Sequence, residues 1–188
     1  HSSQNEQDSR HYAKASKTMM LEPSDSAECL EFAKMALSLS EKFDTPVILR
    51  LSTRVAHSRG LAEVGERVDN GLKEYKKDPM KYVMMPGMAI KKHVVVEQRV
   101  LDQTAWAETA PINMVEMNDT KIGVITAGIS YTYAKEALGD KASYLKLGCV
   151  YPLPVKLIKD FAAKCDKVYV LEELDPFIEE HCRQIGVD

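Results

Sequence analysis

The chain is predicted to be an α/β protein built on a parallel sheet, because strand and helix patterns alternate in both halves of its 188 residues. Near the N-terminus a strand pattern, a helix pattern and a second strand pattern follow one another through short links. From residue 121 onward, three more strand patterns alternate with helix patterns. Short links between such units favour parallel strands joined by helical crossovers, with flanking helices covering the sheet.

The N-terminal region combines a polar segment with a βαβ unit. Residues 1–10 contain no hydrophobic anchor, and we interpret them as an internal loop exposed by a cut, ahead of a short helix at 11–17. Either Ser24 or Asp25 can cap the helix between the two strands, and Asp25 and Glu28 have the spacing of a capping box. The predicted strands are Thr18–Glu22 and Val47–Leu51.

Residues 61–117 interrupt the alternation and are predicted to connect two modules. Their first part is charged and contains glycine, whereas Met88–Glu108 suits one long helix. The apolar positions of that helix are Ile90, Val94, Leu101 and Trp106. The predicted organisation therefore has three parts, namely residues 1–60, 61–117 and 118–188.

The C-terminal part is predicted to form a second α/β module. Ser130 is expected to cap the helix after the first strand, and Gly139 is expected to end it. The last helix is expected to begin near Pro176, since proline is tolerated in a first helical turn. The predicted strands are Ile122–Thr126, Ala142–Leu147 and Lys167–Glu172.

Composition excludes several classes of function. The formal net charge of -3 provides no electrostatic footprint for nucleic acid, and no apolar run is long enough for a membrane span. The four cysteines are far apart, which favours reduced, buried thiols in a cytoplasmic protein over a metal or iron–sulfur site. The five histidines show no metal-ligand spacing, so no metal site is predicted.

Polar residues cluster where strands are predicted to end. Arg54, His57 and Ser58 follow the strand Val47–Leu51, at the sheet edge where open α/β proteins bind ligands. A ligand site, a subunit interface and a solvated loop all remain open for this cluster. Glu172 and Glu173 also end a strand, and a capping or interface role is favoured over acid–base chemistry because adjacent strand residues point to opposite faces.

The polar N-terminal segment offers groups suited to a ligand but no defensible pair of nucleophile and base. The Arg10 guanidinium has the geometry to clamp a carboxylate, and Gln4 and Asn5 carry amides that bind polar edges. By contrast, the single glycine of the turn Thr126–Ser130 favours a simple tight turn over an anion site. Catalytic residues are therefore not assigned from these patterns.

Several stretches together resemble the alpha subunit of indolepyruvate ferredoxin oxidoreductase. The resemblance runs over nearly the whole chain, and the first and third stretches are the most specific. Residues 54–58 also resemble the corresponding junction of pyruvate:ferredoxin oxidoreductases. The stretches are His1–Arg10, Leu21–Ser26, Ser52–Gly60, Gly123–Tyr131, Leu145–Gly148, Tyr151–Pro154 and Val170–Leu174.

The resemblance implies a thiamine-diphosphate-dependent enzyme that oxidatively decarboxylates indolepyruvate and other aryl 2-oxo acids. Coenzyme A would accept the acyl group, ferredoxin would accept the electrons, and Mg²⁺, [4Fe-4S] clusters and a beta subunit would complete the parent enzyme. It also implies that residues 1–60 are a remnant of a pyrimidine-binding domain. Residues 118–188 would then form a transketolase C-terminal-like domain with three α/β/α layers.

The resemblance further implies that this piece is inactive alone and holds no cofactor. No G-D-G…N motif for a metal-bound diphosphate and no cluster-type cysteine run are present, and the activating glutamate is expected upstream. Gln4, Asn5 and Glu6 are the expected cofactor contacts. Arg10 is the expected contact for a substrate carboxylate because of the chemistry of its guanidinium, and not because of a family motif.

Two alternatives remain open for function. One is a non-catalytic α/β scaffold for subunit contact, and the other is a related oxidoreductase acting on pyruvate or another 2-oxo acid. The strand Val47–Leu51 and its helix are expected to be short of sheet partners and to expose a strand edge and apolar surface, so the fragment is also expected to associate with itself.

Overall fold

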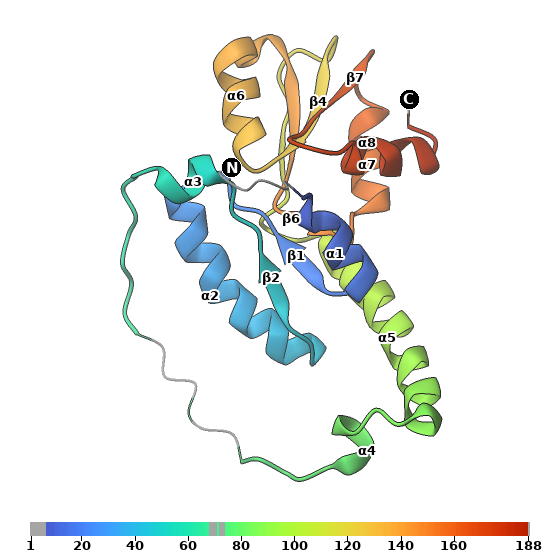
Figure 1. The fold of residues 1–188 in the computed structure, drawn as a ribbon. Coiled ribbons are helices and arrows are strands. Elements are labelled where there is room, and N and C mark those ends of the chain that lie inside the picture. Colours follow the sequence, from blue (N-terminus) through green and yellow to red (C-terminus); the bar gives the residue numbers. More distant parts are fainter. Residues whose placement is uncertain (1–6, 68–70, 72–73, 188) are drawn as a thin grey trace.

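The computed structural model describes residues 7–67, 71 and 74–187, which form two β-sheets with helices around them (Figure 1). The first sheet has the strand order β2-β1-β6 and the second has the order β3-β5-β4-β7. The strands are β1 Met19–Leu21, β2 Val47–Leu49, β3 Met114–Glu116, β4 Gly123–Ala127, β5 Ser143–Leu147, β6 Cys149–Tyr151 and β7 Val168–Leu171. The helices are α1 Ser9–Ser16, α2 Ser26–Phe43, α3 Thr53–His57, α4 Pro79–Tyr82, α5 Pro86–Ala107, α6 Ile129–Leu138, α7 Val155–Ala162 and α8 Phe177–Gln184, with a 3₁₀ turn at Gly139–Lys141.

The predicted N-terminal βαβ unit is confirmed. β1 and β2 run parallel, and α2 crosses between them. The backbone N–H of Glu28 donates to the Asp25 carboxylate at 2.8 Å, as the capping-box spacing predicted. The carboxylate of Glu28 accepts from the backbone N–H of Ser24 at 2.8 Å and also pairs with Lys146 of β5. The start of α2 is therefore fixed both locally and by the second sheet.

The second sheet confirms the predicted fold class. β4 pairs in parallel with both β5 and β7. Ile125 packs with Phe161 of α7 and Ile178 of α8, whereas its neighbour Val124 packs with Ala134 of α6. Because neighbouring strand residues face opposite sides, helices cover both faces of this sheet. The arrangement is the three-layer α/β/α architecture that the sequence predicted.

The connection between the two sheets was not predicted. β5 continues through Gly148 into β6, which leaves the second sheet and pairs antiparallel with β1 of the first. The Asn113 side-chain oxygen accepts from the backbone N–H groups of Gly148, at 2.9 Å, and Cys149, at 3.0 Å. The N- and C-terminal parts therefore share one network of backbone hydrogen bonds.

The predicted boundaries at residues 60 and 117 remain predictions, although one strand of the predicted connector belongs to the sheet of the following part. β3 lies within the predicted connector, yet it forms the antiparallel edge of the four-stranded sheet beside β5. Three residues are too few for a periodicity signal, so only the pairing reveals this strand.

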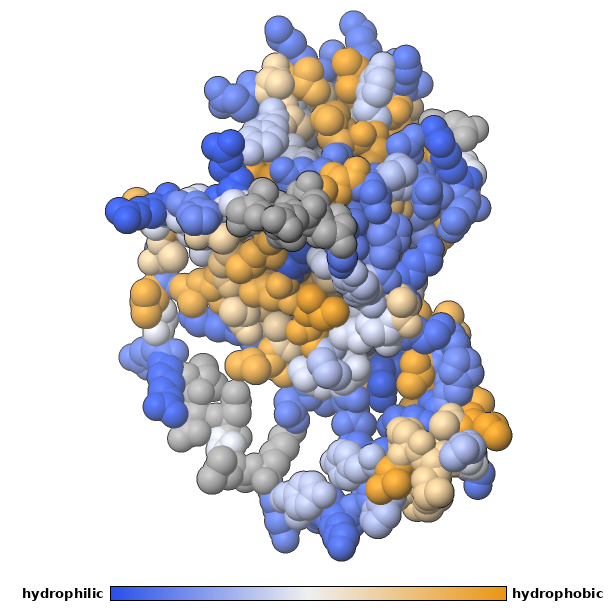
Figure 2. Space-filling model, viewed as in Figure 1, coloured by the Kyte–Doolittle hydropathy of each residue, from blue (hydrophilic) through white to orange (hydrophobic). Residues whose placement is uncertain are grey.

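Helix α5 has the predicted position, but its apolar positions mostly face solvent. Ile90, Val94 and Leu101 are 73%, 69% and 63% exposed, whereas the buried residues are Gln103 and Ala107. The reason is that only the C-terminal end of α5 packs on the core, while the rest extends away from the sheets toward α4 (Figure 1). Figure 2 shows hydrophobic side chains at the surface around this α4–α5 junction.

Two predicted helix ends have different outcomes. Gly139 ends α6 with a positive φ of 53°, as expected. Ser130 is not the cap, because α6 begins one residue earlier at Ile129, with Gly128 before it at φ 51°. A side chain at Gly128 would collide with the carboxylate of Glu22, so the glycine is required by this close approach. Among the described residues, no helix is both long and apolar enough to cross a membrane.

The junction between the sheets predicts a stability effect at Gly148. A Cβ added there would lie 2.9 Å from the Ile112 Cβ, so Gly148→Ala is expected to lower the free energy of unfolding by about 1–3 kcal/mol. Chemical denaturation measures this change. Gly87→Ala is the control, because a Cβ at Gly87 meets no atom within 4 Å, and this variant should be neutral or slightly more stable. Equal effects of the two substitutions would contradict the close approach.

Candidate functional site

A buried guanidinium fixes the start of α1 against the C-terminal module. Arg10 is 1% exposed, and its Nε donates to Asp8 at 3.0 Å. Its Nη1 donates to Glu172 at 2.5 Å, and its Nη2 donates to the carbonyl oxygens of Glu173 at 2.8 Å and Asp175 at 2.9 Å. Every guanidinium nitrogen therefore has a protein acceptor. The predicted substrate-carboxylate contact of Arg10 finds no support in this arrangement.

The carboxylates around Arg10 each hold a helix end as well. Asp8 is the N-cap of α1 and accepts from the Arg10 backbone N–H at 2.9 Å. Glu172 accepts from the backbone N–H groups of Ile178 at 2.9 Å and Glu179 at 3.0 Å, at the start of α8. Glu172 therefore has the capping role that the sequence favoured. Burial raises the pKa of Asp8, but the hydrogen bonds and charge of Arg10 outweigh burial and lower it below its ordinary value.

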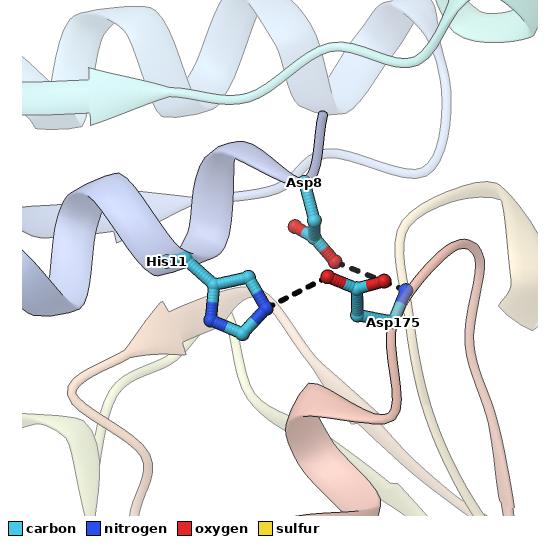
Figure 3. A group of neighbouring side chains, drawn as sticks. All are labelled: Asp8, His11 and Asp175. Atoms are coloured by element: carbon cyan, nitrogen blue, oxygen red, sulfur yellow. Dashed lines mark hydrogen bonds and ion pairs between the residues drawn. The ribbon is translucent and has the colours of Figure 1, made fainter. Parts of the chain in front are cut away.

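Asp8 also takes part in a small group with two exposed side chains. Figure 3 shows His11 on α1 and Asp175 before α8 pointing toward one another, and the His11 Nε2 lies 2.9 Å from an Asp175 oxygen. One ligand atom from each of the three residues lies within 4.8 Å of the others. A cation placed here would compete with Arg10 for Asp8, because the guanidinium already binds both oxygens of that carboxylate.

A cleft of about 780 Å³ opens between the two modules. It lies beyond the carboxyl end of β2, next to α3, which is the usual place for a ligand in an open α/β sheet. On the opposite side it is bounded by Tyr133 of α6 and by the loop after β7. Its lining residues are Gln7, Ser9, Arg50, Leu51, Ser52, Thr53, Arg54, His57, Tyr133, Glu173 and Leu174.

The structure separates the predicted cluster after β2. Arg54 and His57 are exposed and line the cleft. Ser58 does not line it, and instead donates to the Val55 carbonyl at 2.8 Å and lies 3.2 Å from the Ser26 hydroxyl at the start of α2. Ser58 therefore sits at the junction between α3 and α2.

The predicted cofactor contacts Gln4, Asn5 and Glu6 lie outside the described residues. The residues that follow them along the chain, Gln7 and Ser9, line the cleft. The polar N-terminal segment and the cluster after β2 therefore lead to the same cleft, although they are separated by more than 40 residues in sequence.

The charged floor of the cleft was missed by the sequence analysis. Arg50 forms an ion pair with Glu22, and the two side chains are 8% and 6% exposed. Burial raises the pKa of Glu22 above its ordinary value although Arg50 and Arg10 oppose the shift. The sequence did contain a signal for this ion pair. Glu22 directly follows β1 and Arg50 directly follows β2, and the last residues of these neighbouring parallel strands, Leu21 and Leu49, are partners in the register.

Within the described residues, the four cysteines do not come together with other possible ligands as a group that could hold a metal ion. Burial raises the pKa of Cys149 to about 12 and that of Cys182 to about 11. Cys29 and Cys165 also have a raised pKa, chiefly because of burial.

Comparison with solved structures identifies the class of fold. The chain superposes on a 2-oxoglutarate:ferredoxin oxidoreductase from Magnetococcus marinus with a TM-score of 0.57 and 16% identity. The superposition covers 90% of this chain and 38% of the other. The α/β arrangement is therefore one that occurs in a 2-oxoacid:ferredoxin oxidoreductase. No family model matches the chain.

Sequence comparison with curated proteins identifies the relationship more specifically than the structural comparison does. The chain is 38% identical to indolepyruvate oxidoreductase subunit IorA of Archaeoglobus fulgidus over 192 residues, and 39% identical to that of Thermococcus kodakarensis over 198 residues. Both matches cover 100% of this chain and 31% of the relative. The chain is therefore related over its whole length to indolepyruvate oxidoreductase subunit IorA, and it spans less than a third of that subunit. The predicted resemblance is confirmed.

The buried pair of Arg10 and Asp8 predicts a large stability effect. Arg10→Met leaves the Asp8 and Glu172 carboxylates without their cation and is expected to cost about 3–5 kcal/mol of unfolding free energy in urea titrations. Arg183→Met is the control, because Arg183 is 68% exposed and pairs with Glu179 on the surface, which is worth about 0–1 kcal/mol. Comparable losses in the two variants would rule out a special role for Arg10.

The lowered pKa of Asp8 predicts an acid-dependent contribution to stability. A carboxyl with a depressed folded-state pKa stabilises the fold above its unfolded pKa, and the contribution is lost as pH falls through the folded value. Parent and Asp8→Asn should therefore differ most in unfolding free energy at neutral pH, and the difference should shrink below about pH 4. Denaturation curves between pH 7 and pH 3 provide the measurement. If the difference in unfolding free energy between the parent and Asp8→Asn does not change with pH, the proposed role of the Asp8 charge is contradicted.

Proposed function

We propose that this chain is part of the alpha subunit of an enzyme that oxidatively decarboxylates indolepyruvate and related aryl 2-oxo acids. The acyl group passes to coenzyme A and the electrons pass to ferredoxin. The observation that carries the proposal is the match over 95–100% of the chain, at 37–40% identity, to six proteins named indolepyruvate oxidoreductase subunit IorA. Thiamine diphosphate, Mg²⁺, [4Fe-4S] clusters and a beta subunit belong to the whole enzyme in this proposal.

Within that enzyme, the cleft between the modules contributes one wall of a site for an anionic ligand. Arg54 and His57 extend from α3 into the cleft, and Arg50 lies at its floor. Arg54 has no ion-pair partner among the described residues, so its guanidinium is available to a carboxylate or phosphate. The oxo-acid carboxylate and the phosphates of coenzyme A or thiamine diphosphate share this anionic chemistry.

The chain does not carry the reaction by itself in this proposal. Cys149 and Cys182 are buried and have a raised pKa, the sequence lacks a G-D-G…N motif, and the Arg10 guanidinium is taken up by protein acceptors. These features support a role in positioning ligands and joining domains. Electron transfer and cofactor chemistry would rest on other parts of the subunit.

Two other functions compete with this proposal. A non-catalytic scaffold would use the cleft only for packing, and a related oxidoreductase would act on pyruvate or another 2-oxo acid. The cationic lining of the cleft favours a ligand over simple packing, because unpaired Arg and His side chains gain little from an apolar contact. Assays of the whole enzyme with each 2-oxo acid distinguish the substrates.

The cleft proposal is tested in the full-length subunit assembled with its partner subunit. Arg54→Gln is expected to raise the KM of an anionic substrate or coenzyme A about tenfold or more, because a charge-assisted hydrogen bond is lost. The assay follows reduction of an electron acceptor by indolepyruvate in the presence of coenzyme A. Arg59→Gln is the matched control, since Arg59 is exposed but does not line the cleft. Identical kinetics of the two variants would refute the anion site and leave the family relationship intact.

Experiments on the 188-residue chain alone test whether it needs the rest of the subunit for cofactor binding and catalysis. Calorimetry with thiamine diphosphate and Mg²⁺ is expected to detect no tight binding, and the chain is expected to show no turnover of indolepyruvate. Tight binding or turnover by this chain would overturn the proposal that the complete site needs the rest of the subunit.

A further inference from the structure

The loop between β7 and α8 holds a leucine in an unfavourable backbone conformation. Leu174 has a φ of 71°, in the left-handed region that residues with bulky side chains rarely adopt. Among the described non-glycine residues, Lys17 and Asp44 also have a positive φ, and each is the C-cap of a helix, a usual place for this conformation. Leu174 lies in a loop and caps no helix, so its conformation has another cause.

Hydrogen bonds to buried side chains fix both peptide units next to Leu174. In the peptide before it, the Glu173 carbonyl accepts from the Arg10 Nη2 at 2.8 Å. In the peptide after it, the Asp175 backbone N–H donates to the Asp8 carboxylate at 3.4 Å. The Asp175 carbonyl also accepts from the Arg10 Nη2, at 2.9 Å. Rotation about the backbone bonds of Leu174 would displace these groups, so the network of Arg10 and Asp8 maintains the unfavourable conformation.

This conformation leaves an apolar side chain in the lining of the cleft. Leu174 lines the cleft and is 47% exposed, and Tyr133 of α6 bounds the same side and is also 47% exposed. A single exposed leucine is ordinary on a protein surface. A leucine that is half exposed and also has an unfavourable backbone gains from neither feature within the described chain, and such positions cluster where proteins bind ligands.

Charges divide the cleft into two different sides. The cationic side chains Arg50, Arg54 and His57 all come from the end of β2 and from α3. The charged residue on the opposite side, next to the exposed leucine, is the acidic Glu173. A ligand with a carboxylate at one end and a ring at the other is therefore oriented, because its carboxylate is attracted to the guanidinium groups and repelled by Glu173.

We propose that Leu174 and Tyr133 form an apolar wall that contacts the ring of an aryl 2-oxo acid and selects it over an aliphatic one. Arg10 is a positioning residue for this wall, because it fixes the backbone on both sides of Leu174. This inference rests on the proposed function and names the part of the cleft that determines specificity. A flat ring packs well against an aliphatic and an aromatic side chain, whereas the methyl group of pyruvate is too small to cover them.

The wall is tested in the full-length subunit assembled with its partner subunit. Leu174→Asn keeps a side chain of similar shape that tolerates a positive φ, but it replaces the apolar contact by an amide. It is expected to raise the KM of indolepyruvate about tenfold with little change in kcat, because the ring contact is made in both the ground state and the transition state. The KM of coenzyme A should stay close to that of the parent. So should the inhibition constant of pyruvate, measured as a competitor of indolepyruvate.

Two further variants separate the ring contact from a structural effect. Leu174→Met keeps an apolar side chain and is expected to keep the KM of indolepyruvate close to that of the parent. Leu37→Asn makes the same substitution at a leucine of α2 that is 68% exposed and does not line the cleft, and it should leave every constant unchanged. In urea titrations of the 188-residue chain, Leu174→Asn should be as stable as the parent or more stable, because asparagine adopts a positive φ more readily than leucine.

Three results would overturn the inference. One is a set of kinetic constants in Leu174→Asn that matches those of Leu37→Asn. Another is an equal weakening of indolepyruvate and pyruvate, which would indicate a general structural effect. The third is a raised KM of coenzyme A with an unchanged KM of indolepyruvate, which would assign the wall to the coenzyme. In each case a parent enzyme that oxidises indolepyruvate leaves the proposed function intact, whereas a parent that does not oxidise it removes both.

Discussion

The buried guanidinium of Arg10 is the interaction on which the arrangement of the two modules depends. It connects the start of α1 with the loop between β7 and α8, which lie more than 160 residues apart in sequence. A buried cation is tolerated only when its hydrogen-bonding groups find acceptors, and Asp8, Glu172 and two backbone carbonyls supply them. Because Asp8 and Glu172 also cap α1 and α8, one network sets the positions of both helices.

The continuation of β5 into β6 determines where the cleft lies. β5 belongs to the C-terminal sheet, and β6, one residue later, belongs to the N-terminal sheet. Gly148 makes this transition possible, since no side chain fits between it and Ile112. The carboxyl end of β2 is thereby held close to α6 and the loop after β7, and the cleft with Arg54 and His57 lies in this space. The cleft is a product of the junction and not of either module alone.

The candidate site was predictable in part. The polar segment before α1 and the cluster after β2 were both candidates for a ligand site, because loops ahead of helices and the carboxyl ends of parallel strands are where open α/β proteins bind ligands. Only the fold shows that both lead to one cleft and that the Arg10 guanidinium is buried against protein acceptors. The charge of Arg10 and the nearby Asp8 are visible in the sequence, but the other acceptors of its hydrogen bonds come from residue 172 onward.

The sequence alone determined the elements with a strong local signal. The parallel strands, the capping of α2 by Asp25, the end of α6 at Gly139 and the length of α5 follow from residue patterns within a few turns of chain. Only the tertiary structure decided the antiparallel strands β3 and β6, the ion pair of Glu22 and Arg50, and which face of α5 meets solvent. Periodicity reports that a segment has an apolar side, whereas its burial depends on whether another part of the fold reaches it.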